Sequence, residues 1–434
     1  MYKYNKKSAF YCIIELTQTT IQGGALNEKL TLKRMLTYMK SVYQIPQKIK
    51  SLTDYRQRKS IPFFNIIMPV FLILTLQYES FHMVFSSENM QRKLKNCIKG
   101  RIPKVDAVRD VLEKTNPDEV RQIHETVIDK IYRNRVFRGG TIGGFLTVGI
   151  DGVELFNSTK KSGPNSLTRR NKAGEKEYFY RSVVCMTVGE SPHVIIGQEM
   201  LKPRDGGEKD EGELTGGKRL IKRLRKRHGH FADVIVADAL YLNAPFINTV
   251  LKCRMDTVIR LKDERREIFK DAEKLFQKDE GKKRGFHQEK KEIEVWDLSD
   301  FPMEGVEKKV RVLRFKETWK EKGAEKSRTM WVVTTLETAD YRTIWKMMNK
   351  RWDIEENGFH QLKTYYHAKH CYCQRATEVI FNLMMLAFNM REMYLYRRIK
   401  GFKESKMTRK DVSQIFRDDL LLESQHEILY GKGG

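Results

Sequence analysis

The sequence predicts an α/β protein in which a mixed sheet is flanked by helices, with a β-rich insertion and a helical N-terminal region. Three observations support this prediction. Apolar residues recur at helical spacing early in the chain. From Phe145 onward, apolar runs typical of buried strands alternate with helical segments. A highly charged stretch that begins near residue 263 then interrupts this alternation.

Residues 1–143 should form the helical N-terminal region. Residues 26–44 and 105–137 show apolar positions three or four apart, and Pro103 and Pro117 stand where helices often begin. The apolar run at residues 61–77 contains two prolines and is slightly short for a bilayer span. We therefore expect a buried helix there and no association with a membrane.

One α/β domain should comprise residues 144–262 and 329–400, and residues 263–328 should form the β-rich insertion. A charged helix and exposed strands are expected within the insertion. A long helix should follow at residues 341–366, and residues 401–434 should form a helical tail. Buried strands and helices of the first part are predicted at 145–156, 178–188, 193–201, 213–227 (helix), 233–238, 243–253 (helix) and 256–262.

The charge balance favours a polyanionic partner. The chain has 82 Lys and Arg against 56 Asp and Glu, a net charge of +26. Neutralising phosphates releases condensed counterions, so nucleic acid is the expected partner, although charge serves solubility alone in some proteins. Candidate DNA contacts lie in a basic helix and in a basic loop, where a solvated charged face is the alternative. These residues are Lys222, Arg223, Lys226, Arg227, Arg169 and Arg170.

The cysteines and the absence of known cofactor motifs indicate the cellular compartment and exclude some cofactors. Six cysteines in 434 residues do not make a disulfide framework, and no secretory signal is evident, so we expect a cytoplasmic, nucleoid-associated protein. The spacing of His367, His370, Cys371 and Cys373 does not match a zinc finger. No phosphate-binding G-x-x-x-x-G-K-[ST] motif occurs, so no nucleotide cofactor is expected.

Three acids stand in positions suited to metal binding. Asp151 and Asp238 each close a buried-type strand, where catalytic groups collect in open α/β sheets, although a turn or cap role is the alternative. Glu355 falls on a predicted buried helix face, and a buried carboxylate needs a cation. Arg351, one turn earlier, could supply that cation instead of a metal, and Glu356 should lean toward solvent. The face comprises Trp345, Met348, Trp352, Glu355, Phe359, Leu362 and Tyr366.

Carboxylate oxygens are the ligands of hard divalent cations. Three acids from two strands and one helix would suit Mg²⁺ or Mn²⁺, with positions left for water and phosphate. A pair of such ions can hold the attacking and leaving oxygens of a phosphoryl displacement. We therefore predict a two-metal site at Asp151, Asp238 and Glu355.

These motifs together resemble a known family. GIDG (149–152), ADALY (237–241) and RWDIEENGFHQLK (351–363) resemble the DDE insertion-sequence transposases, whose catalytic domain has an RNase H-like fold. The subgroup with a β-rich insertion carries a Tyr–Arg–Glu–Lys signature. By this resemblance the three acids are catalytic, and Arg351 and Lys363 contact phosphates of the DNA end. Two departures stand out: Met348 replaces the signature tyrosine, and Lys363 lies one residue beyond the usual spacing from Glu355.

The resemblance also implies partners and a reaction. It implies cut-and-paste transposition on double-stranded DNA, both element ends and target, by a homodimer that pairs the ends, with a hairpin intermediate in related enzymes. The N-terminal region would help to recognise the ends, and the insertion would hold a flipped base, with Trp296, Trp319 and Trp331 as candidates. Two alternatives remain, a DNA-binding protein without catalysis and an inactive transposase.

Overall fold

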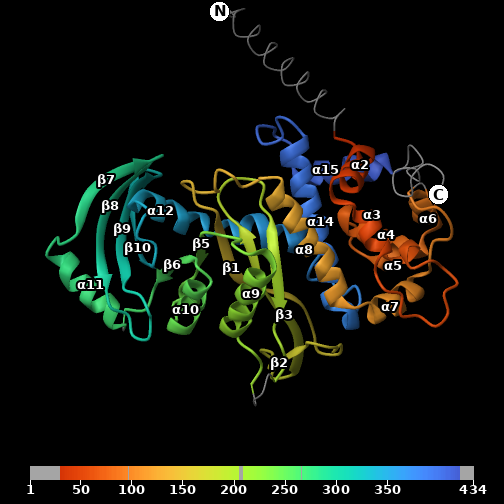
Figure 1. Cartoon of the computed structure of the whole chain (residues 1–434), viewed down its shortest axis with the longest axis horizontal. Helices are drawn as coiled ribbons and strands as arrows, with labels where there is room; N and C mark the ends of the chain where they lie inside the picture. Colours follow the sequence, from red (N-terminus) through yellow and green to blue (C-terminus); the bar gives the residue numbers. More distant parts are fainter. Residues whose placement is uncertain (1–29, 96, 205–208, 265, 421–434) are drawn as a thin grey trace, which may run out of the picture. The chain divides into compact units, whose positions relative to one another are not determined.

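The computed structural model describes residues 30–95, 97–204, 209–264 and 266–420. The chain forms two compact units, one from residues 1–124 with 364–434 and the other from residues 125–363 (Figure 1). The first unit therefore combines segments from both ends of the chain. The boundaries expected from the sequence, after residues 143, 262, 328 and 400, stay a prediction.

The first unit is helical. Its longest helix, α14 (Thr377–Arg398), packs on α4 (Phe64–Thr75), in which all residues are buried, so the apolar run is an interior helix. Arg391 of α14 is fully buried and donates to the Thr75 carbonyl and to Ser413 Oγ of α15 (Arg409–Asp419). The other helices are α2 (Leu32–Tyr43), α3 (Ile45–Lys50), α5 (Phe81–Ser86), α6 (Glu88–Lys95), α7 (Val105–Lys114), η3 (Gln374–Ala376) and the start of α8 (Pro117–Arg133).

Some expectations for this unit concern residues that lie outside the described ranges, namely 26–29, Cys12 and 421–434. Within those ranges, no helix is both long enough and apolar enough to cross a membrane. Among the cysteines that the structure describes, Cys97, Cys185, Cys253 and Cys373 are buried thiols.

The second unit is built on one sheet of mixed direction. Its central strands are β1 (Thr147–Ser158), β5 (Val234–Ala237) and β6 (Asp256–Leu261), which pair in parallel. β3 (Lys176–Thr187) runs antiparallel to β1, and β2 (Leu167–Arg170) and β4 (Ile195–Met200) pair with β3. The predicted buried strands are present, whereas β2 occupies a segment that was expected to be a loop.

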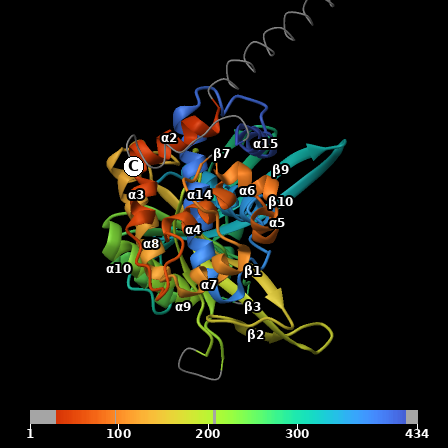
Figure 2. The same cartoon turned by 90° about the vertical axis from the view of Figure 1, so that its right-hand side faces the viewer.

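The insertion continues this sheet rather than forming a separate one. Beyond β6 the strand order is β10 (Ala324–Thr334), β9 (Val310–Glu321), β8 (Lys291–Phe301) and β7 (Lys282–Gln288). Figure 2 shows β9 and β10 extending as a long two-stranded arm. The expected charged helix is α11 (Glu267–Gln277), and β7 follows it from Lys282. β8 is half-buried rather than exposed, since Ile293 and Val295 enter the interior.

Helices cover the two faces of the central strands. α9 (Glu213–His228) packs on β1, β3 and β4, and α10 (Ala244–Lys252) packs on α9 and β6. α12 (Tyr341–Lys350) packs on β5 and β6, and the π-helix η2 (Ile354–Phe359) packs on β1 and β3. α13 (His360–Thr364) follows, and the short helix η1 (Ala239–Tyr241) follows β5. The helix that carries Glu355 is thus held over the parallel strands.

Candidate active site

Two of the predicted acids lie next to each other on neighbouring strands. Asp238 directly follows β5, whereas Asp151 lies within β1, which continues to Ser158 rather than ending at this acid as predicted. β1 and β5 pair in parallel up to Gly149 and Val236, and continuing that register sets Asp151 beside Asp238. Neighbouring strands lie ~4.8 Å apart. A Cβ on Gly149 would touch Ile354 of η2, so Asp151, two residues later, points to the same face as η2.

A single arginine links the third predicted acid to the first. Arg351 Nη2 donates to Glu355 Oε1 at 2.9 Å, and Arg351 Nη1 lies 3.7 Å from Asp151 Oδ2. The arginine side chain is 10% exposed, and its Nη1 has no hydrogen-bond acceptor among the described residues. The ion pair that the sequence offered as an alternative for Glu355 is therefore present. The same guanidinium group brings Glu355 to the edge where the aspartates lie.

The acids do not close into one cluster in this arrangement. Among the residues that the structure describes, no three His, Cys, Asp or Glu side chains are close enough together to hold a metal ion. This includes the run from His367 to Cys373. At the predicted site, the Arg351 guanidinium lies between Asp151 and Glu355.

Burial and neighbouring acids disfavour the charged form of Asp151. Burial raises the pKa of Asp151 to about 6, and the charges of Asp238 and Glu213 raise it as well. The Gly152 N–H, which donates to Asp151 Oδ1 at 2.8 Å, and the Arg351 charge lower this pKa. A cation beside Asp151 would relieve both the repulsion and part of the cost of burial.

The donor atoms fit a hard divalent cation. Asp151 and Asp238 each use Oδ1 to accept a backbone N–H, from Gly152 and from Leu240 at 2.9 Å. Oδ2 of Asp151 faces Arg351 rather than the backbone. Oxygen donors fixed in this way, with one atom of each carboxylate turned from the backbone donor, suit Mg²⁺ and Mn²⁺.

Sequence reasoning missed a further acid, Glu213. It begins α9, its side chain is 7% exposed, and it pairs with Arg181 and accepts from the Tyr241 hydroxyl at 3.4 Å. Burial raises the pKa of Glu213, and the Arg181 charge lowers it. A Cβ on Gly152 would collide with the Glu213 carboxylate, so the glycine after Asp151 leaves room for this acid. That glycine was the available signal in the sequence.

The helix that carries Glu355 departs from α-helical geometry. In η2 the backbone forms i→i+5 hydrogen bonds, such as that from the His360 N–H to the Glu355 carbonyl. The predicted face, which assumed regular spacing, was wrong at Trp352, which is 49% exposed. Glu355 itself is partly exposed rather than buried. The remaining members of the face are buried: Trp345, Met348, Phe359, Leu362 and Tyr366.

The π-helix also bears on the choice between two adjacent glutamates. Glu355 reaches Arg351, whereas Glu356 is exposed. A π segment accommodates one more residue per turn than an α-helix. Lys363 is the eighth residue after Glu355. Because of the π segment between them, its angular position around the helix axis is closer to that of the seventh residue in a regular α-helix. Its Nζ lies 5.8 Å from the centre of the Phe359 ring.

The predicted basic face of α9 is only partly available to a ligand. Arg223 pairs with Glu125 at 2.6 Å and with Glu199 at 3.0 Å. Arg227 pairs with Glu125 at 3.1 Å and with Asp129 at 2.8 Å. These two arginines therefore join α9 to α8 and β4, and long-range partners of this kind are invisible in the local sequence. Lys222 and Lys226 are exposed.

The basic loop after β1 shows the same contrast. Arg169 pairs with Glu154 at 2.7 Å and with Glu177 at 2.6 Å, and its guanidinium stacks on Phe179 at 4.4 Å. Arg170 is exposed and donates only to the Gly174 carbonyl at 3.0 Å. Arg169 thus braces β1, β2 and β3, and Arg170 remains the more accessible cation.

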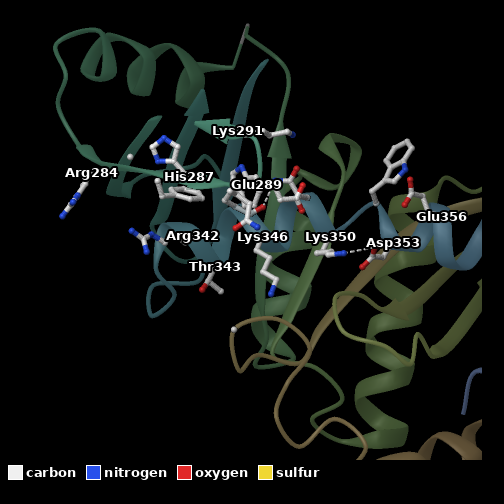
Figure 3. A pocket seen from close by; sticks show the side chains of 17 residues that line it. Arg284, His287, Glu289, Lys291, Arg342, Thr343, Lys346, Lys350, Asp353 and Glu356 are labelled. Carbon is white, nitrogen blue, oxygen red and sulfur yellow. Dashed lines mark hydrogen bonds and ion pairs between the residues drawn. The ribbon is translucent and has the colours of Figure 1, made fainter. Parts of the chain in front are cut away.

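A groove of about 970 Å³ lies between β7 and α12 (Figure 3). Basic side chains come from both walls, and Lys350 points toward Asp353, with Nζ 3.8 Å from its carboxylate (Figure 3). Glu356 and the exposed Trp352, which are close to Glu355 in the sequence, also line the groove. The basic residues that line the groove are Arg284, His287, Lys291, Arg342, Lys346 and Lys350.

The tryptophans proposed for base stacking are mostly occupied. Trp296 is 5% exposed and lies 3.7 Å below the Arg314 guanidinium. Trp331 is 8% exposed and packs on Phe269 with ring centres 4.5 Å apart. Trp319 is half-buried beside Lys291. Core packing therefore accounts for Trp296 and Trp331.

Comparison with solved structures finds a piggyBac transposase in a synaptic complex with hairpin DNA and the NurA nuclease from Sulfolobus solfataricus. The first has a TM-score of 0.46 and 14% identity, and the match covers 92% of this chain and 80% of that chain. The second has a TM-score of 0.25 and 13% identity, over 47% of this chain and 72% of that chain. At these scores the likenesses carry no weight for function. Comparison with curated protein sequences gives no significant match.

A family model assigns the chain directly. The transposase DDE domain model matches residues 158–390, a range that contains Asp238, Arg351 and Glu355 and begins after Asp151. This range is more than half of the 434 residues. The chain therefore belongs to the transposase DDE domain family and is a DNA transposase.

Proposed function

We propose that this transposase cuts DNA at the ends of its element and joins them to target DNA by cut-and-paste, with Asp151, Asp238 and Glu355 as the metal-binding acids. The main support is that the parallel register sets Asp151 beside Asp238 while Arg351 connects Asp151 to Glu355. The proposed cofactor is a pair of Mg²⁺ or Mn²⁺ ions, for which the oxygen donor set is suited.

The proposed chemistry assigns separate tasks to the side chains. Bound ions would activate the attacking hydroxyl and stabilise the leaving oxygen of an in-line displacement. Asp151 and Asp238 are oriented by backbone N–H groups, so their free oxygens need little rearrangement to accept a cation. Arg351 has a buried Nη1 without an acceptor, and a phosphate oxygen of the DNA would provide one.

The groove between β7 and α12 is the proposed path for DNA that leaves the acidic site. Arg284, Arg342 and Lys346 line it and have no carboxylate partner among the described residues, so a phosphate backbone would neutralise them. Exposed Lys222, Lys226 and Arg170 are retained as further DNA contacts, together with Lys363. Arg223, Arg227 and Arg169 are assigned structural roles, because their charges are paired within the unit.

The larger assembly is proposed from the nature of the reaction. Both ends of an element must be cut and joined together, so we propose a homodimer that pairs two ends. The helical unit is proposed to recognise those ends, in the cytoplasm beside the nucleoid. We retain the Tyr–Arg–Glu–Lys subgroup as a proposal, with the π-helix compensating for the offset of Lys363.

The test is a strand-nicking assay on labelled ends of the element, with Mg²⁺ or Mn²⁺ and with EDTA. Wild-type protein should nick the end only with metal. Asp151→Asn, Asp238→Asn and Glu355→Gln should each lower the nicking rate by at least about 10³-fold while end binding in Ca²⁺ is retained. Glu356→Gln is the matched control, since it removes an adjacent, exposed carboxylate, and it should nick within a few-fold of wild type.

Both alternatives differ from an active transposase in this assay. A DNA-binding protein without catalysis and an inactive transposase each bind the ends and never nick them. Loss of nicking in Glu356→Gln with retention in Glu355→Gln would reassign the third ligand. Nicking by Asp151→Asn at the wild-type rate would remove the proposed site altogether.

A further inference from the structure

Arg260 lies at the end of the same row of residues as the two aspartates. β5 and β6 pair in parallel up to Ala237 and Ile259, so the continued register sets Asp238 beside Arg260. Asp151, Asp238 and Arg260 thus occupy neighbouring positions on β1, β5 and β6, with side chains on the α12 face of the sheet. Sequence reasoning assigned Arg260 only to a buried strand.

Arg260 is a half-buried cation without a local counterion. Its side chain makes no hydrogen bond or ion pair with any residue in the described ranges. Asp238 is the nearby acid, yet its Oδ1 accepts from the Leu240 N–H and no ion pair joins it to Arg260. A structural salt bridge therefore does not explain the position of this arginine.

Other guanidinium groups crowd the same place. Burial lowers the pKa of Arg260 first, and the charges of Arg328 and Arg351 lower it further. Arg328 is held by Glu317 at 2.8 Å, and Arg351 by Glu355, but Arg351 Nη1 remains without an acceptor. The charges of Arg328 and Arg351 therefore act on Arg260, and Arg260 and Arg351 both have donors without an acceptor among the described residues. An anion with several oxygens would satisfy those donors.

We propose that Arg260 binds a phosphate of the cleaved DNA strand within one nucleotide of the scissile bond, and so positions that strand over Asp151 and Asp238. This inference rests on the proposed function of the three acids. Asp238 is one strand spacing, ~4.8 Å, from both Asp151 and Arg260. A phosphate held by Arg260 is thus adjacent to one held at the acids. The planar guanidinium group of Arg260 can donate to two phosphate oxygens. Arg351 Nη1 is available to donate a further hydrogen bond to the same phosphate.

The experiment compares Arg260→Ala, Arg260→Lys and wild type in the full chain. Single-turnover nicking in Mg²⁺ should fall about 10²-fold in Arg260→Ala, the order of loss for one transition-state donor. Arg260→Lys should recover part of this rate, because it restores the charge but not the fork. Lys252→Ala removes one positive charge from an exposed helix of the same unit and should nick at the wild-type rate. Thermal unfolding of Arg260→Ala should not shift downward, since no partner is lost.

Substrates with single neutral methylphosphonates identify the contacted phosphate. At one position near the scissile bond, neutralisation should slow wild-type nicking but cause no further loss in Arg260→Ala. The affinity for a pre-nicked end, measured in Ca²⁺, should show the same lack of additivity between Arg260→Ala and the methylphosphonate. This measurement gives a result even if the protein does not nick DNA. At every other position, the fold-loss of nicking rate caused by Arg260→Ala and the fold-loss caused by the methylphosphonate should multiply.

Two results would overturn the inference. One is an Arg260→Ala rate within three-fold of wild type, roughly 0.65 kcal/mol by the transition-state relation. The other is losses that multiply at every methylphosphonate position. If the three acids prove essential in either case, the proposed function stands and the inference about Arg260 alone fails. If Asp151→Asn nicks normally while Arg260→Ala shows the coupling, the acidic site fails and the phosphate site stands.

Discussion

Replacing Asp151 with asparagine should stabilise the metal-free protein at neutral pH. The Asp151 side chain is 21% exposed, and its pKa rises from 3.8 to about 6 in the folded state because of burial and neighbouring acids. The folded state therefore holds this proton more tightly than the unfolded state. The resulting stabilisation is complete below pH 3.8 and is lost as the pH rises through about 6.

The magnitude follows from the pKa difference. A shift of about two units corresponds to about 3 kcal/mol of unfolding free energy between the two pH limits. Asparagine keeps an oxygen for the Gly152 N–H but gives up the attraction to Arg351, so about 3 kcal/mol is an upper limit. Asp151→Asn should exceed wild type by a large part of this amount above about pH 7 and equal it near pH 4.

Urea unfolding in EDTA at these two pH values measures the difference, and Asp271→Asn on exposed α11 is the charge-matched control. Adding Mg²⁺ should stabilise wild type by mass action and Asp151→Asn much less. The reasoning is refuted if Asp151→Asn is less stable than wild type at neutral pH. It is also refuted if the difference does not change between the two pH values.

Three further predictions follow from the packing. Glu317 is fully buried and holds Lys291, Arg328 and the Trp345 indole, so Glu317→Leu should lower the unfolding free energy by about 2–4 kcal/mol, checked by urea unfolding. Trp352→Ala should change it by less than about 0.5 kcal/mol, whereas Trp345→Ala should cost about 3–5 kcal/mol; equal losses in the two would contradict the observed exposure. Gly152→Ala should force the Glu213 carboxylate aside, lowering stability by about 1–3 kcal/mol and abolishing nicking, and a fully active Gly152→Ala would disprove this crowding.

Local patterns predicted the sheet well because its strands are marked by their own residues. β1 begins with a buried apolar run, β5 is buried throughout and the middle of β6 is buried, and Asp151 and Asp238 directly follow the first two of these runs. The helix face failed at Trp352, because apolar spacing cannot show that α12 ends at Lys350 and that Trp352 lies in the turn before the π-helix η2. Regular spacing was the only assumption available from sequence.

Contacts between distant segments account for the other differences. Arg223 was predicted to contact DNA, but its partner Glu125 is 98 residues away in sequence. Glu213 approaches Asp151 only because the start of α9 lies against Gly152 of β1, which the order of elements did not show. Arg260 looked like part of a buried strand until the parallel register set it beside Asp238. The net charge of the chain could identify the class of partner. It could not show which Lys and Arg side chains lack an acidic partner in the folded protein.

The helical unit draws on both ends of the chain, and this has a consequence for biosynthesis. α4 emerges from the ribosome early, whereas α14, which covers it, is made about 300 residues later, after the whole catalytic unit. At the usual elongation speed of roughly 5–20 residues per second, the apolar surface of α4 is not covered by α14 until tens of seconds after α4 is made. During that interval a nascent chain is exposed to chaperones and proteases. The supply of finished transposase is therefore sensitive to translation speed, even though the catalytic unit itself is complete first.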